Sequence, residues 1–181
     1  TKTVGGAGED LEEGNIIASP ATWQDGTASI TLSTNTGLSI QYQVNSTSGQ
    51  WTTISSGGTV SNLEHNDTVY ARLWDGNNAG DYASTTILDN TNPVVTVSPQ
   101  GTATTNSIAV SVQAIDNESG MADNVTYTYY IKQSTELDSS YQAPSGATGI
   151  ANNTYTFTGL TAGTSYDIKV EVNGDKAGHV G

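Results

Sequence analysis

Five acidic residues of this sequence could together form a metal-binding site. They lie in short stretches rich in Asn and Asp, a composition typical of loops. The five are Asp89, Asp116, Glu118, Asp123 and Asp175. Carboxylates brought close together repel one another unless water or a cation lies between them. Ca²⁺ binds six to eight oxygen atoms in flexible geometry, so these residues are predicted calcium ligands.

The alternative is that these acids only stabilise turns. Asp and Asn side chains commonly bond to the backbone two residues further on, and the turn then remains in solvent. The regularly spaced acidic loop of a dedicated calcium-binding motif does not occur in this sequence.

Aromatic side chains form a second candidate site. Tyr70 and Trp74 are the predicted ligand residues, and with Trp23 and Trp51 they could provide a platform for stacking sugar rings. The alternative is packing in the core and at sheet edges, where large rings are usually buried.

Motifs of known catalytic chemistry do not occur in the sequence. His65 and His179 are far apart and have no partner at metal-ligand spacing. There is no Gly-x-Ser-x-Gly, no His-Glu-x-x-His and no phosphate-binding loop. We therefore predict that the protein is not an enzyme and that Ca²⁺ is its only candidate cofactor.

The charge balance limits the kinds of partner. The chain has 18 acidic and 5 basic residues, a formal net charge of −13, and no Cys. Nucleic-acid binding requires a basic surface, and an anionic membrane would repel the chain. The absence of Cys excludes disulfides and thiolate metal sites.

Alternation of apolar and polar residues predicts strands through most of the chain. Residues 154–158 and 166–172 alternate with a period of two, which is typical of strands with one buried face. In residues 69–73 we expect Val69, Ala71 and Leu73 to point inward. This pattern predicts an all-β fold.

The length of 181 residues fits two sandwiches of about 100 residues each. We predict an acidic flexible lead-in over 1–14, a first β-sandwich over 15–89, a linker over 90–93 and a second sandwich over 94–181. Pro93 biases the residue before it towards an extended conformation, which favours a boundary there.

Sandwich topology would bring the predicted calcium ligands together. The loops 116–124 and 173–178 should lie at the pole where the chain enters the second sandwich. That pole is expected to face the linker and the first module, so Asp89 would converge with the acids of the two loops. Carbonyl groups of Asn90 and Asn117 would complete the ligand set.

The segment that leads into residues 166–172 resembles a known structural device. Tyr166 follows a Leu-x-x-Gly corner formed by Leu160 and Gly163, and this arrangement looks like the tyrosine corner of immunoglobulin-type sandwiches. Residues 153–172 resemble strands E and F of a fibronectin type III or bacterial immunoglobulin-like module. The resemblance implies two tandem sandwiches of this class.

The first half resembles the immunoglobulin-like repeats of large Firmicutes surface proteins. The matching stretches are 21–26, 40–42, Trp51, 68–73 with Asp75, and 89–93. Repeats of this family usually carry Asp-x-Ala-Gly-Asn near their end. Here 75–81 is an altered version with an insertion, and 175–179 carries His179 in place of the Asn.

The resemblance implies a non-catalytic structural or adhesive segment of a larger exported bacterial protein, acting as a spacer or a protein-interaction module. The implied location is extracellular, at the bacterial cell surface or secreted. The implied partners are other domains of the same polypeptide and a host or cell-wall protein or glycan. The alternative is an accessory carbohydrate-binding module of a secreted polysaccharide-degrading enzyme.

Two further expectations concern the second module. A sandwich needs another strand after the turn at 175–179, so the module either lacks its last strand or takes it from another segment. Some surface modules contain a Lys–Asn amide, which requires a buried Lys. Alternation along their strands places Lys132 and Lys169 on the outward face, so we expect them to be exposed and no such cross-link to form.

Overall fold

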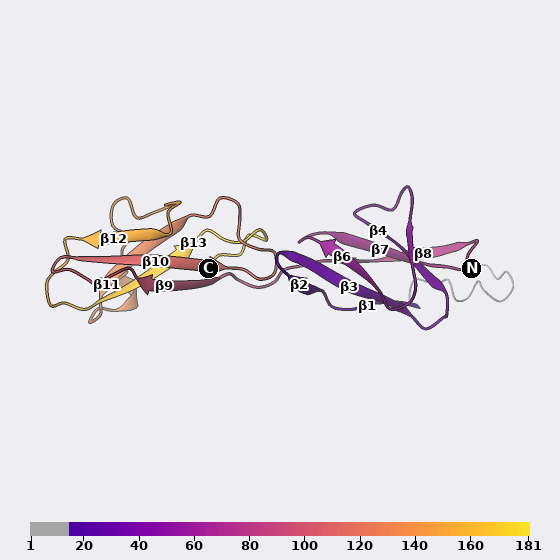
Figure 1. The fold of residues 1–181 in the computed structure, drawn as a ribbon, viewed down its shortest axis with the longest axis horizontal. Coiled ribbons are helices and arrows are strands. Elements are labelled where there is room, and N and C mark those ends of the chain that lie inside the picture. Colours follow the sequence, from indigo (N-terminus) through magenta and orange to yellow (C-terminus); the bar gives the residue numbers. More distant parts are fainter. Residues whose placement is uncertain (1–14) are drawn as a thin grey trace. The chain divides into compact units, whose positions relative to one another are not determined.

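The computed structural model describes residues 15–181, and the chain divides into two compact units, 1–89 and 90–181. Each unit is a β-sandwich, so the all-β, tandem-sandwich prediction is confirmed (Figure 1). The predicted lead-in 1–14 lies outside the described residues. Among residues 15–181, no helix has the length and apolar character needed to cross a membrane.

The first unit consists of two sheets. The first contains β1 (Ile16–Ala18), β2 (Thr22–Gln24), β3 (Thr27–Thr34) and β6 (Gly58–Leu63), and the second contains β5 (Thr52–Ile54), β4 (Ser39–Val44), β7 (Thr68–Trp74) and β8 (Ala79–Thr86) in that order. All pairings in both sheets are antiparallel. β1 and β2 pair with different parts of β3, and Pro20, which has no N–H to donate, lies between them.

Alternation along the strands builds the core of the first unit. On β7, Val69, Ala71 and Leu73 are 1%, 4% and 0% exposed, which confirms the predicted inward set. They belong to one apolar cluster with the buried side chains of β3 and β6. The residues between them on β7 therefore form the outer face of the sheet.

A two-residue turn joins β2 to β3. Asp25 and Gly26 both have positive φ, 50° and 84°. Positive φ at both central residues is the type I′ geometry, whose twist matches that of an antiparallel hairpin. The Asp-Gly pair thus produces the turn that its sequence predicts.

The second unit has the same layered organisation. One sheet contains β12 (Thr154–Thr158), β10 (Ser107–Ile115) and β9 (Val94–Pro99) in that order, and the other contains β11 (Tyr127–Gln133) and β13 (Tyr166–Val172). On the side of β13 away from β11, Val172 and Gly181 exchange backbone hydrogen bonds of 3.0 and 3.4 Å.

Stacked rings fill the centre of the second unit. Tyr129 is fully buried, and its ring lies 5.0 Å from that of Tyr155, which in turn contacts Phe157 edge-on at 4.9 Å. The Tyr129 hydroxyl donates to the carbonyl of Asn152 at 2.9 Å, which satisfies its buried polar atom. Burial raises the pKa of Tyr129 to about 12.

Backbone hydrogen bonds to β11 order the connection from β11 to β12. Gln142 and Ile150 form bridges to Ile131 and Tyr127 of β11, and the N–H of Tyr129 donates to the carbonyl of Ala147 at 2.9 Å. Ala147 is fully buried. This connection therefore covers the free edge of β11 and contributes to the core.

The same connection buries Lys132. Its strand parity points it outward, as expected, yet the residue is only 6% exposed. Its Nζ donates to Asp167 Oδ2 at 2.7 Å and to the Glu136 carbonyl at 3.1 Å, and lies 5.2 Å from the centre of the Tyr141 ring. The expectation of an exposed Lys132 was therefore wrong, because residues after β11 fold over it. Its side-chain partners are carboxylates, and these keep it in an ion pair.

A tyrosine corner closes the loop before β13. The N–H of Thr161 donates to Oη of Tyr166 at 3.0 Å, which confirms the contact implied by the Leu-x-x-Gly-x-x-Tyr pattern. The bond spans five residues and fixes the direction in which the chain enters β13.

Substitution of Tyr166 by Phe should destabilise the second unit by about 0.5–1.5 kcal/mol, the usual net value of one neutral hydrogen bond. Urea unfolding of the whole chain measures the change. Tyr70→Phe is the matched control, because within residues 15–181 the Tyr70 hydroxyl makes no hydrogen bond. Equal stability of the two variants would contradict the corner's role.

The Lys132–Asp167 pair should make the second unit depend on pH. Hydrogen bonding to Lys132 lowers the pKa of Asp167, and the same bond raises the pKa of Lys132. The Asp167 contribution is present above the usual Asp pKa of about 3.9 and is lost as the pH falls through the folded-state value. The Lys132 contribution is present below about pH 10.4 and is lost as the pH rises through its folded-state value.

Lys132→Met should therefore lower the stability at neutral pH and flatten the loss of stability on acidification. Denaturant unfolding from neutral to acidic pH gives both quantities. Lys169→Met is the control, because the Lys169–Glu171 pair is half exposed on both sides and such pairs contribute little. An unchanged acid profile in Lys132→Met would refute the assignment.

Candidate functional site

Two acidic loops lie together at one end of the second unit. Met121 and Asp175 form a backbone bridge. The N–H of Lys176 donates to the Gly120 carbonyl at 2.9 Å, and the N–H of Ala122 donates to the Gly174 carbonyl at 3.3 Å. Residues 116–124 and 173–179 therefore form one loop cluster.

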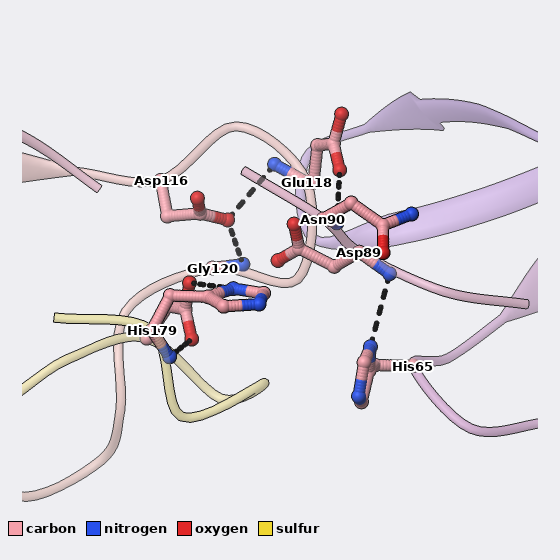
Figure 2. A network of polar contacts seen from close by, with 8 residues as sticks. His65, Asp89, Asn90, Asp116, Glu118, Gly120 and His179 are labelled. Atoms are coloured by element: carbon pink, nitrogen blue, oxygen red, sulfur yellow. Dashed lines mark hydrogen bonds and ion pairs between the residues drawn. The ribbon is translucent and has the colours of Figure 1, made fainter. Parts of the chain in front are cut away.

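Asp116 shapes the first of these loops. Its Oδ1 accepts the N–H groups of Glu118 at 3.0 Å and Gly120 at 2.9 Å, as Figure 2 shows. A carboxylate that accepts two backbone amides holds a turn closed. This geometry matches the turn-stabilising alternative for Asp116.

Asp175 and His179 shape the second loop. The Asp175 side chain is fully buried, and its Oδ1 accepts the backbone N–H of His179 at 2.9 Å. Its Oδ2 lies 3.0 Å from Nδ1 of the same His. Gly174 has a φ of 133°, and a Cβ there would come within 2.5 Å of the His179 carbonyl oxygen, so the turn requires glycine. The sequence shows this His only as an isolated residue, because its partner is recognised only once the turn is built.

The other predicted metal ligands are placed differently. In the second unit, Glu118 Oε2 accepts the N–H of Asn90 at 3.4 Å, and Asp123 is exposed. Asp89 belongs to the first unit, where it is 1% exposed and its N–H donates to Nδ1 of His65 at 3.0 Å (Figure 2). His65 and His179 thus both have hydrogen-bond partners. The predicted calcium site stays a prediction.

The first unit carries an aromatic group on the outer face of its second sheet. Tyr70 and Arg72 alternate with the buried residues of β7, and Tyr82 of β8 lies opposite Arg72 in the register. Trp51, just before β5, reaches over the same face: its ring lies 4.0 Å from Cζ of Arg72 and 6.3 Å from the ring of Tyr82. We call Trp51, Tyr70, Arg72 and Tyr82 the aromatic–arginine face.

The predicted ligand residues Tyr70 and Trp74 have different neighbours. Tyr70 contacts Tyr82 edge-on at 5.5 Å and belongs to the aromatic–arginine face. Trp74 has no ring contact with any residue of 15–181, and it lies opposite Ser39 and Ala79 in the sheet register. Trp23 packs against the core, as the alternative interpretation expected. The sequence prediction did not include Arg72, although it is the only arginine of the chain.

Comparison with known proteins agrees with the fold. The chain is similar to a segment of two fibronectin type III domains from chicken tenascin, with a TM-score of 0.54, 14% identity and 91% of each chain covered. It also aligns with the FN1–FN3 domains of chicken CNTN1, at 12% identity and a TM-score of 0.34, over 91% of this chain and 62% of that one. No protein-family model matches the sequence, and no curated protein sequence matches it either.

The tenascin likeness defines a class of structure, the tandem fibronectin type III or immunoglobulin-like β-sandwich. At 14% identity it establishes the fold alone. A carbohydrate-binding role stays a prediction.

Calcium binding is tested most directly by thermal unfolding. If the loop cluster binds Ca²⁺, millimolar calcium should raise the melting temperature, because a ligand of the native state stabilises it by mass action. Asp116→Asn should remove the shift, whereas Asp138→Asn, whose side chain is 94% exposed, should keep it. An unchanged melting temperature, or a shift that survives in Asp116→Asn, would contradict the prediction.

Proposed function

We propose that this chain is a non-catalytic structural and interaction segment of a larger exported bacterial surface protein. Its two sandwiches serve as spacer modules and present their outer faces to protein partners. The segment lies outside the cell, on the surface or in a secreted product.

The observation that carries the proposal is that each unit has its own apolar core. The ten buried residues of the first core all come from residues 28–87, and the six of the second all come from residues 110–170. A unit with its own core can fold as an independent domain in a tandem array. Repetition of such domains is a simple way to extend a protein from a surface.

The residues behind the bacterial resemblance have structural roles, which also supports a modular repeat. Trp23 and Tyr42 pack against the core of the first unit. Asp75 accepts the N–H groups of Asn77 at 2.7 Å and Asn78 at 2.6 Å, and these bonds lower its pKa. The shared motif thus preserves a sandwich and its turns.

Surface exposure of the full-length protein is the test. Antibodies raised against residues 15–181 should stain intact cells of the source organism, and brief protease treatment of these cells should remove the staining. A cytoplasmic protein stained in parallel reports cell integrity. Staining that appears only after lysis, together with no signal in the culture medium, would overturn the proposal.

A further inference from the structure

Arg72 is held in place by neutral groups alone. Its guanidinium lies against the Trp51 ring, and its Nε donates to Oε1 of Gln41 at 3.0 Å. Gln41 is in turn held by Thr53, whose Oγ1 accepts from Nε2 at 3.3 Å. No carboxylate of residues 15–181 forms an ion pair with Arg72, although the chain has 18 acidic residues.

This arrangement differs from that of two of the three lysines in the second unit, Lys132 and Lys169; the third, Lys176, is exposed. Lys132 pairs with Asp167 at 2.7 Å and Lys169 pairs with Glu171 at 2.6 Å. Both lysine charges are therefore matched within the unit. In the first unit the Arg72 guanidinium is oriented by a ring and an amide, and its charge is left for an external acceptor.

The side chains around Arg72 are also held in fixed positions. Nε2 of Gln43 donates to the carbonyl of Gln50 at 2.6 Å, which fixes the segment that carries Trp51. Oε1 of Gln43 is the one buried side-chain polar atom without a hydrogen-bond partner among residues 15–181. A buried acceptor without a hydrogen-bond partner is costly. Tyr82, opposite Arg72, is 47% exposed.

We infer that the aromatic–arginine face is a binding hot spot for a protein partner that presents an Asp or Glu side chain to Arg72. This inference rests on the proposed function as an interaction module and names the surface and the chemistry of its partner. Trp, Tyr and Arg are the residue types that dominate binding energy at protein interfaces. A guanidinium can donate two parallel hydrogen bonds to a carboxylate, and stacking on an aromatic ring keeps it oriented.

The ring geometry favours a protein partner over a sugar. A flat platform requires nearly coplanar rings, but Tyr70 and Tyr82 are inclined at 86°, and Trp51 and Tyr82 at 37°. The guanidinium also covers one face of the Trp51 ring. Rings at these angles form a shaped apolar surface around a single charge. Such a surface fits an acidic side chain flanked by apolar ones.

Selection from a random peptide library displayed on phage tests the inference, with the whole chain as the bait. The selected peptides should share one Asp or Glu position next to apolar residues. Arg72→Gln should weaken binding of a synthetic selected peptide by about tenfold or more, which is the usual effect of removing a hot-spot side chain. Arg72→Lys should restore little of the lost affinity, because an ammonium group does not stack on a ring or form two parallel hydrogen bonds as a guanidinium does.

Lys169→Gln is the matched control, since it removes an equal charge from the second unit and should leave the affinity unchanged. Thermal melts show whether each variant is folded. If Arg72→Gln does not fold, Tyr82→Ser is the alternative variant. It removes an exposed ring from the same face and should weaken binding of the peptide by a similar factor. Replacement of the peptide's acid by its amide should have the same effect as Arg72→Gln.

Three results would overturn the inference: no peptide selected above background, selected peptides without a shared acid, or binding that survives both Arg72→Gln and Tyr82→Ser. A glycan array probed in parallel would instead identify a sugar ligand if only glycans bind. These results are separate from surface exposure. A chain that is exposed on cells but selects no acidic peptide would refute this site and leave the proposed function intact.

Discussion

Burial of one face of every core strand is the constraint on which both units depend. In the first unit Ala28, Ile30 and Leu32 of β3 are at most 2% exposed and pack in the same cluster as the inward residues of β7. A shift of one residue in register would move each of these side chains to the solvent face. The register, and with it the position of every outward side chain, is therefore set by the core.

The cores leave the outer faces and the loops available for other roles. The second unit uses its loop cluster to close one end, with Asp116 and Asp175 accepting backbone amides. The first unit uses the outer face of one sheet to hold an arginine against a tryptophan. Asp116 and Asp175 thus stabilise loops of the second unit, whereas the face that we propose for interaction in the first unit is built around a cation.

Lys132 and Arg72 show two ways in which an acidic chain surrounds a positive charge. Lys132 lies under a connection that supplies a carbonyl and a ring, and Asp167 of β13 supplies a carboxylate, so its charge is matched inside the unit. Arg72 has a ring and an amide as its neighbours. The first arrangement stabilises a fold, whereas the second preserves a charge for recognition.

Much of the fold follows from the sequence because it depends on near neighbours. Alternation determines which residues of β7 and β13 point inward, Asp25-Gly26 determines a turn, and Tyr166 reaches only five residues back to close its corner. The meeting of residues 116–124 with 173–179 also follows, since sandwich topology places those two connections at one end.

Tertiary structure decided the features that join distant segments. Burial of Lys132 and Ala147 results from the folding of the connection after β11 over that strand, and strand parity alone left Lys132 exposed. The approach of Trp51 to Arg72 depends on where a loop crosses an already formed sheet. The sequence by itself determined the strands, their inward faces and their tight turns, because these are local. Which outward side chains meet was decided only by the folded chain, because it depends on the paths of loops that no local pattern specifies.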